Sequence, residues 1–436
     1  MGMFTGHNVL LVSSIRWPLT AKVALAFLRH GCKVEAVCPR DHPLSFVSGV
    51  SKIYPYHGLD SPASLYAAIT SARPDLVIPC DDSVVWQLHE LHRTKPELRP
   101  LLERSLGAAA GYETVACRAK LMDIARELNI RAPHTIEIKD RADLRAWFSE
   151  PNLSVNAGVL SGVLKLDWTC GGAGVQIAHS LAEAEQGLAL LHRPATVMTA
   201  LGRWLLIHDA LAYWKWKSHK QPVVTLQQFV VGRPANAMLA CRDGKVLGMV
   251  TVEVLCAQST TGTALVVRQI DNDEIRHAAE QLAERLQLSG FHGLDFMIED
   301  ATGHAYLIEL NPRLTQLGHL QTAAQGDLVG ILCGASHEVP PAHNKTFIGE
   351  ETIAFFPEAI FSSPNPRYLD TSYIDVPWEE PKLVIELMRR DWRDRGLLAR
   401  LYRAVRPPKK TAVVFAGVAA AGARRVEEPA SVPGRG

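Results

Sequence analysis

Short apolar runs alternate with helical patterns over the first hundred residues, and this alternation limits the fold of the chain more than any other feature. Asn8 to Ser13, Lys33 to Cys38 and Asp75 to Pro79 are predicted strands. Leu19 to His30 and Ala63 to Ser71 have the periodicity of helices. Strand–helix–strand alternation predicts a doubly wound parallel sheet.

Ligands of such sheets bind beyond the carboxyl ends of the strands, here near Ser13–Ser14 and Asp81–Asp82. The first turn, SSIRWP, contains no glycine, so the fingerprint of dinucleotide-binding domains is absent. A dinucleotide-dependent enzyme built on this domain is therefore disfavoured, and it stays an alternative for a ligand experiment to decide.

The bulk composition excludes several partners. With 436 residues, the chain is long enough for two to four domains. Its 46 Lys and Arg residues nearly cancel its 45 Asp and Glu residues, so no global basic field attracts nucleic acid or an anionic membrane. The longest late apolar stretch, Ala412 to Ala423, is too short to span a bilayer.

The cysteines and the N-terminus favour a cytoplasmic protein. The eight cysteines are scattered and none forms a C-x-x-C pair, which predicts reduced thiols rather than a zinc site or a disulfide framework. The N-terminal residues MGMFTGHNVLLVSS lack the charged region of a secretory signal.

A lysine on a strand precedes a glycine-rich loop in Val163 to Val175, VLKLDWTCGGAGV. Glycines let backbone N–H groups approach a polyphosphate, and Lys165 on the adjoining strand can reach it as a point charge. A glycine-rich turn beside a surface lysine explains the same residues. This motif alone does not decide between them.

Two further strands, Pro222 to Val231 and Ala237 to Cys241, are predicted next. Within them, Leu226 to Gly232 (LQQFVVG) could read the edge of an adenine through its backbone, with Phe229 and Val230 near the ring. An ordinary buried strand has the same pattern.

Acidic residues lie at the same phase of two consecutive predicted strands. Asp295 lies in GLDFM (293–297) and Glu309 in LIELNPR (307–313). A hairpin places both near one end of a groove, where Asp295, Glu309 and Asn311 would offer hard oxygen ligands to Mg²⁺. A turn acid and a surface glutamate are the alternative, but the apolar flanks argue for buried carboxylates with a partner.

Together, and in this order, these motifs resemble the ATP-grasp superfamily of carboxylate–amine and carboxylate–thiol ligases over roughly residues 8 to 335. The chain is most similar to stand-alone proteins related to the carbamoyl-phosphate synthase large chain and to amino-acid ligases. The resemblance implies an α/β and α+β architecture: a Rossmann-like domain (1–108), ATP-grasp lobes at 109–183 and 184–338, and a C-terminal helical extension (339–436). Within that extension, 364–377 is expected to be a loop and 382–405 a helix, and the tail from about 407 is expected to be disordered.

The resemblance also implies roles for individual residues. Lys165 would contact the α- and β-phosphates of ATP, and Arg313 the phosphoryl group or an acyl phosphate. The loop over the phosphates would be Gly171, Gly172, Ala173 and Gly174. The adenine-contacting hinge would be Gln227, Gln228, Phe229 and Val230. The ligands of one or two Mg²⁺ ions, or of Mn²⁺ in their place, would be Asp295, Glu309 and Asn311.

The sequence departs from the family pattern at two positions. Many members carry a phosphate-binding lysine where this chain has Arg118, which we favour over Lys120 for that role. Many also carry a ribose-binding glutamate where this chain has Pro234, and Asn236 is the candidate substitute.

Substrate identity lies beyond the sequence. Arg268 could anchor a carboxylate, and His319 and Gln321 could line an acceptor pocket, although structural roles explain them equally well. An insertion over 199–221 contains AYWKWKSHK, which could contact a substrate or a partner but is more typical of a solvated surface segment.

The expected function is an ATP-dependent ligase that activates a small-molecule carboxylate as an acyl phosphate and joins it to an amine, with a homodimer favoured by resemblance alone. A non-catalytic ATP-binding sensor or partner subunit is the alternative.

Overall fold

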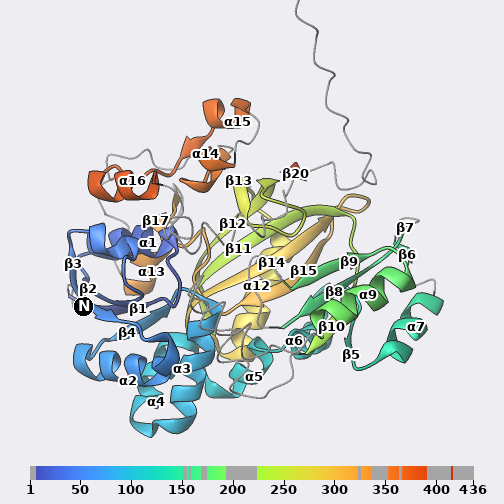
Figure 1. The fold of residues 1–436 in the computed structure, drawn as a ribbon, viewed down its shortest axis with the longest axis horizontal. Coiled ribbons are helices and arrows are strands. Elements are labelled where there is room, and N and C mark those ends of the chain that lie inside the picture. The colour runs from blue at the N-terminus through green and yellow to red at the C-terminus, as the bar shows by residue number, and fades with distance from the viewer. Residues whose placement is uncertain are drawn as a thin grey trace, which may run out of the picture.

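Three main sheets organise the chain. The computed structural model describes residues 6–150, 155–156, 159–167, 174–192, 223–322, 326–334, 352–362, 366–389 and 414–415. In Figure 1 the N-terminal parallel sheet lies at the left, a small antiparallel sheet at the right and a large sheet between them.

The N-terminal domain is the predicted parallel sheet, with strand order β3-β2-β1-β4. Its strands are β1 (Asn8–Val12), β2 (Lys33–Cys38), β3 (Val50–Pro55) and β4 (Leu76–Pro79). Its helices are α1 (Pro18–Arg29), α2 (Ser61–Ala72), α3 (Asp82–Thr94) and α4 (Arg99–Leu106). The sequence pattern missed β3 because this edge strand is largely exposed and lacks an apolar run.

The small lobe is a four-stranded sheet of order β5-β10-β8-β9. Its strands are β5 (Thr135–Ile138), β8 (Gly162–Leu166), β9 (Val175–Ala178) and β10 (Val224–Gln228). Helices α7 (Arg141–Ser149) and α9 (Leu181–Leu191) contact each other and pack on it around Trp147 and Leu164. Its core is separate from the other cores.

The large sheet has the order β15-β14-β11-β12-β13-β18-β19. Its long strands are β11 (Gly232–Arg242), β12 (Lys245–Ala257), β13 (Ala264–Gln269), β14 (Gly290–Glu299) and β15 (Ala305–Asn311). Helices α12 (Asp273–Leu286) and α6 (Arg118–Glu127) contribute to one core with it. The short helices α5 (Tyr112–Val115) and α13 (Leu328–Cys333) lie before α6 and after β15.

The chain passes from the small sheet to the large one at residues 229–231. The predicted strand Pro222 to Val231 therefore ends early, at Gln228, and the predicted strand Ala237 to Cys241 is part of the longer β11. The Val231 carbonyl accepts a hydrogen bond from the Asp300 N–H, which ties the crossing to the large sheet.

The N-terminal domain and the large sheet share one continuous core, which includes Phe27, Met238 and Leu328. Where α4 meets β14 the two backbones nearly touch. Gly290 has a φ of +78°, and a Cβ there would lie 2.1 Å from the Ser105 carbonyl oxygen. Only glycine fits so close an approach at a positive φ.

The C-terminal segment adds strands to the large sheet as well as helices. Between 364 and 377, where a loop was expected, lie α15 (Pro366–Thr371) and β19 (Tyr373–Ile374), which pairs with β18 (Thr352–Ala354). A two-residue strand is too short for periodicity to reveal. Helix α14 (Glu358–Phe361) precedes this segment and α16 (Pro381–Leu387) follows it. The helix expected over 382–405 therefore ends at Leu387, and residues 390–405 lie outside the described part.

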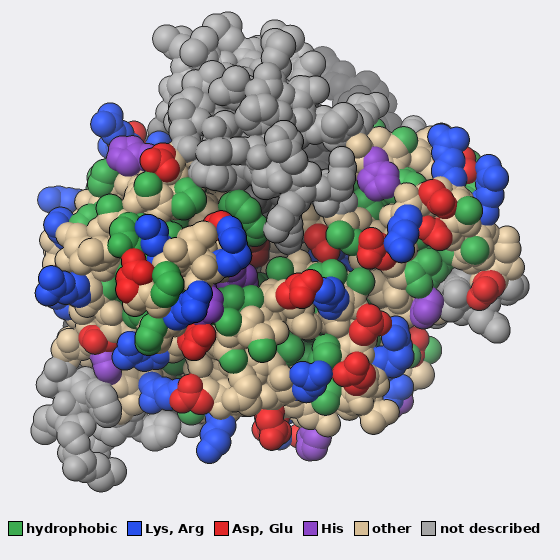
Figure 2. Space-filling view, turned by 90° about the horizontal axis from the view of Figure 1, so that it is seen from below, with side chains coloured by type: hydrophobic (Ala, Val, Ile, Leu, Met, Phe, Trp, Pro, Cys, Tyr) green, Lys and Arg blue, Asp and Glu red, His purple; other side chains and the backbone are tan. Residues whose placement is uncertain are grey.

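From the expected tail, β20 (Val414–Phe415) pairs with β12, and the remaining tail residues lie outside the described part. On the face shown in Figure 2, basic and acidic side chains are interspersed. Among the described residues, no helix is both long enough and apolar enough to cross a bilayer.

Candidate functional site

Two carboxylates face each other across neighbouring strands of the large sheet. Asp295 of β14 is opposite Glu309 of β15, and on its other side it is opposite Asn236 of β11. Asn236 Nδ2 donates to Asp295 Oδ1 at 2.6 Å, and Asn311 Nδ2 donates to Asp295 Oδ2 at 3.1 Å. The predicted set of Asp295, Glu309 and Asn311 is therefore brought together in one place.

Arg118, at the start of α6, links the two lobes. Its Nη1 donates to Asp167 Oδ1 of the small lobe at 2.9 Å, and its Nη2 donates to Glu309 Oε2 of the large sheet at 2.7 Å. Lys120 instead pairs with Glu113 away from the site, and both side chains are well exposed. The structure thus places Arg118, and not Lys120, beside the carboxylates.

Lys165 projects from β8 into the same site. Its Nζ donates to Gln227 Oε1 at 2.6 Å, and Gln227 Nε2 donates to Thr135 Oγ1 at 3.1 Å. The Lys165 side chain is almost fully buried, which excludes the surface-lysine interpretation. Burial, and then the nearby Arg118 guanidinium, lowers the pKa of Lys165 to about 7.

Burial has the largest single effect on the pKa of three carboxylates in the site. It raises the pKa of Asp295 to about 6, and the neighbouring Glu309 adds to the rise. Burial also raises the pKa of Asp167 to about 6. For Glu309 burial acts in the same direction, but Arg118 and Lys165 outweigh it and hold the pKa below its ordinary value.

The donor set fits a hard divalent cation. Among the described residues, no three His, Cys, Asp or Glu side chains gather closely enough to hold a metal. The Asp295 and Glu309 carboxylates lie opposite each other, whereas Asn311 turns its Nδ2 to Asp295 and its Oδ1 to Arg313. Mg²⁺ in nucleotide sites is commonly held by one or two carboxylates together with phosphate oxygens and water. The residues present are therefore compatible with Mg²⁺ or Mn²⁺ brought in with phosphates.

Arg313 lies where the loop after β15 meets the N-terminal domain. Its Nε donates to Asp82 Oδ1 at 2.8 Å, and its Nη2 donates to Asn311 Oδ1 at 3.3 Å. The guanidinium also lies 5.7 Å from the centroid of the Trp17 ring, which comes from the turn after β1. The carboxyl ends of β1 and β4 thus contribute to the site, as the parallel sheet predicts.

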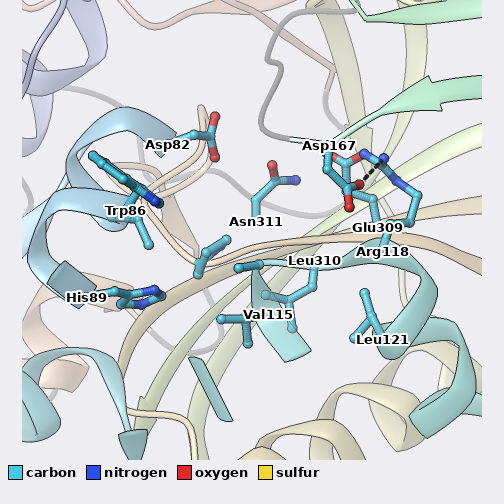
Figure 3. Close-up of a pocket in the computed structure, with 13 residues that line it drawn as sticks. Asp82, Trp86, His89, Val115, Arg118, Leu121, Asp167, Glu309, Leu310 and Asn311 are labelled. Carbon is cyan, nitrogen blue, oxygen red and sulfur yellow. Dashed lines mark hydrogen bonds and ion pairs between the residues drawn. The ribbon is translucent and has the colours of Figure 1, made fainter. Parts of the chain in front are cut away.

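Five of these residues border one cleft (Figure 3), namely Asp82, Arg118, Asp167, Glu309 and Asn311, whereas Lys165, Asp295 and Arg313 do not line it. It lies between α3, the start of α6 and the end of β15, with the Asp82 carboxylate and the Arg118–Glu309 pair on opposite sides of Asn311. The lining residues are Asp82, Val85, Trp86, His89, Val115, Ala116, Arg118, Leu121, Asp167, Glu309, Leu310, Asn311 and Pro312.

The remaining predicted nucleotide contacts either are described and do not line this cleft or lie outside the described residues. Gln227 turns its amide toward Lys165, whereas Gln228 ends β10 and the backbone of Phe229 and Val230 links the two sheets. Gly174 is described, and its carbonyl accepts from the Leu166 N–H at 2.9 Å. Gly171, Gly172 and Ala173 lie outside the described residues, as does the Trp- and Lys-rich segment at 213–220.

Several other candidates are engaged elsewhere. Asn236, the candidate for the ribose, binds Asp295. Arg268 and Arg233 both donate to Glu253, each at 2.7 Å. His319 Nε2 lies 2.8 Å from the buried Asp375 carboxylate, and the Gln321 side chain lies outside the described residues.

Sequence reasoning missed Asp167, Trp86 and His89. Asp167 stands two residues after Lys165 along the same strand direction, and this same-face spacing is a signal that could have found it. Trp86 and His89 lie four and seven residues after Asp82, which is the spacing of one helix face. Only the packing of α3 beside β15 shows that this face borders the cleft.

Comparison with known proteins identifies the fold. Residues 211–316 match the ATP-grasp domain family. The carboxyaminoimidazole ribonucleotide synthase of Aspergillus clavatus, solved with ATP, aligns over 80% of this chain and 81% of its own at 12% identity and a TM-score of 0.56. The N5-carboxyaminoimidazole synthetase of Staphylococcus aureus, solved with ADP, aligns over 76% and 78% at 12% identity and a TM-score of 0.53.

A third solved structure has a similar fold. The biotin carboxylase domain of the Hydrogenobacter thermophilus 2-oxoglutarate carboxylase, solved as a dimer with MgADP, ADP and bicarbonate, covers 78% of this chain and 71% of its own. Its identity is 13% and its TM-score 0.52. No curated protein matches the sequence.

Proposed function

We propose that this chain, which has the ATP-grasp fold and carries an ATP-grasp domain, is an ATP-dependent ligase that activates a carboxylate as an acyl phosphate and joins it to an amine. One observation carries the proposal. Arg118 joins Asp167 of the small lobe to Glu309 of the large sheet, directly beside Asp295 and Lys165. The cationic and anionic groups needed around a polyphosphate therefore converge from both lobes.

In this proposal Mg-ATP lies between the lobes. Lys165 and Arg118 bind its phosphates, and the backbone of Phe229 and Val230 reads the adenine edge. Asp295, Glu309 and Asn311 would hold Mg²⁺, or Mn²⁺, whose charge offsets the charge of the phosphates. Each of the three compared structures was solved with ATP or ADP, which supports this placement.

The reaction has two steps. A carboxylate oxygen of the acid attacks the γ-phosphorus, the bond to the β-phosphate oxygen breaks, and ADP leaves. The ammonium of the second substrate loses one proton to solvent, and the neutral amine nitrogen then attacks the acyl carbon. The carbon–oxygen bond to phosphate breaks, and the second proton of the nitrogen leaves with the phosphate. Arg313, held by Asp82 and Asn311, is positioned to neutralise the transferred phosphoryl group.

The alternative is an ATP-binding sensor or partner subunit without turnover. Pro234 in place of the family's ribose-binding glutamate favours it. Two half-buried carboxylates directly opposite each other in the sheet argue against it, since such a pair is costly unless it serves a cation. A homodimer remains a prediction from resemblance.

The test is ADP release from Mg-ATP with pools of carboxylic acids, in the presence of hydroxylamine, which converts an acyl phosphate to a stable hydroxamate. Hydroxamate formation with one acid, followed by amide formation with one amine, would establish the ligase and name both substrates. ATP binding without ADP release or hydroxamate in any pool would support the sensor.

A further inference from the structure

One face of α3 lines the cleft beyond the predicted phosphate and metal groups. Asp82, Val85, Trp86 and His89 follow one another at helical spacing, and all four border the cleft. In Figure 3 Asp82, Trp86 and His89 run along the side opposite the Arg118–Glu309 pair. The N-terminal domain therefore supplies a wall that the predicted ATP site does not use.

The rest of the wall around Trp86 and His89 is apolar. It consists of Val115, Ala116, Leu121, Leu310 and Pro312. Gln227 to Val230, the proposed adenine contacts, are described and do not line this cleft. The occupant of this part is thus a molecule other than the nucleotide base.

The charges of the lining favour a cation over a second anion. Three carboxylates, Asp82, Asp167 and Glu309, face the cleft; Arg118 pairs with Asp167 and Glu309, and Arg313 pairs with Asp82, so the lining carries one more carboxylate than its guanidinium partners. Asp82 uses Oδ1 for Arg313, and its carboxylate faces the gap above Asn311. A substrate ammonium near Asp82 would be attracted, whereas a substrate carboxylate would be repelled.

The far end of the cleft is aromatic and uncharged. The His89 ring stacks on Tyr112 with ring centroids 4.0 Å apart and an angle of 8° between the rings. Burial, and then the neighbouring His92 and His292, lowers the pKa of His89 to about 3, so its imidazole is neutral near pH 7. Aromatic faces and short aliphatic side chains favour an apolar or aromatic group.

We propose that the cleft between α3 and β15 binds the amine substrate, and that this substrate is a primary amine carrying an aromatic or large apolar group that packs against Trp86 and His89. Its ammonium lies at the Asp82 end, next to the carbonyl that the acyl phosphate presents. The inference rests on the proposed function and names the class of its second substrate.

The experiment compares two reactions of the same enzyme with the activated acid. Hydroxamate formation reports acyl phosphate without the amine, and amide formation is measured with phenethylamine, isoamylamine and ethanolamine. The wild-type chain should have a higher kcat/KM for phenethylamine and isoamylamine than for ethanolamine. Trp86→Ala should lower kcat/KM for phenethylamine about tenfold, with the loss confined to the amine-dependent step.

Two further variants isolate the role of the ring. Trp86→Phe should restore most of the activity with phenethylamine, because it retains an aromatic face. Trp378→Ala removes a tryptophan that is 65% exposed in the C-terminal segment and should change neither reaction.

The outcomes separate this inference from the proposed function. Hydroxamate formation together with a preference for ethanolamine, or equal losses of both reactions in Trp86→Ala, would overturn the inference and leave the ligase intact. The absence of hydroxamate with every acid would overturn both.

Discussion

At the scale of the residue, the single side chain of Arg118 contacts carboxylates of both lobes and affects their ionisation. It holds Asp167 and Glu309 from two different lobes, and with Lys165 it keeps the pKa of the half-buried Glu309 low. A guanidinium can keep both contacts because its donors diverge in a fixed plane. An ammonium at the same position would reach one partner at a time.

We therefore expect Arg118→Ala to raise the KM for ATP at least about tenfold, since a charge-assisted contact to phosphate is lost. Arg118→Lys should recover only part of this loss. Lys120→Ala is the matched control, because Lys120 pairs with Glu113 at the surface. Steady-state ADP release measures all three, and an equal rise in Lys120→Ala would contradict the assignment of Arg118.

Glu309→Gln should lower turnover about a hundredfold or more while the fold remains intact, because it removes a carboxylate proposed to hold the Mg²⁺ that balances the phosphoryl charge. Glu299→Gln, on the same pair of strands but at their exposed end, is the control. Circular dichroism and thermal melting verify the fold of each variant. Full activity of Glu309→Gln would refute the metal-ligand role.

At the scale of the element, strand register decides which groups meet. Asp295 and Glu309 are fourteen positions apart in the chain but directly opposite in the β14–β15 hairpin. A slip of one residue would turn either carboxylate to the other face of the sheet. The start of β14 is fixed by Gly290, whose backbone passes against the end of α4.

Gly290→Ala should lower the free energy of unfolding by about 3 kcal/mol, from strain at positive φ together with a clash against Ser105. Gly303→Ala also lies at positive φ, +75°, but a Cβ there would meet nothing within 4 Å. It should cost only about 1 kcal/mol. Urea unfolding measures the free energy of unfolding of both variants. Equal losses in the two would show that the close approach of Gly290 to Ser105 adds nothing to the cost.

At the scale of the whole molecule, three distant segments meet at Asp375. Its carboxylate accepts from Lys22 Nζ of α1 at 2.6 Å and from the Phe356 N–H at 2.5 Å, and it lies 2.8 Å from His319 Nε2. His319 belongs to the loop that also carries Arg313. The C-terminal segment therefore stabilises the position of a loop that borders the site.

Asp375→Ala should lower the free energy of unfolding by about 3–5 kcal/mol, because it leaves the buried Lys22 ammonium uncompensated. Adding Lys22→Met should recover part of that loss. Denaturant unfolding of the single and double variants tests this, and additive losses would contradict the coupling.

The same carboxylate predicts a dependence on pH. Burial alone raises the pKa of Asp375, but Lys22 and His319 outweigh burial and hold the pKa below its ordinary value. Its contribution to stability is thus present above about pH 4, the unfolded value, and is lost as the pH falls through the lower folded value. The acid limb of the stability curve should be shallower in Asp375→Ala than in the wild-type chain.

The sequence by itself determined the parallel N-terminal sheet, the β14–β15 hairpin and the convergence of Asp295, Glu309 and Asn311. These features depend on local periodicity and on same-face spacing, which the chain carries in its order of residues. It also placed Lys165 on its strand and favoured Arg118 over Lys120.

Tertiary structure alone decided what surrounds those residues. The Trp86 and His89 face of α3, the contact of Asp167 with Arg118 and the network at Asp375 join segments between 49 and 353 positions apart. Such contacts depend on how separate elements pack against one another. The local residue pattern does not show which faces of those elements will be in contact.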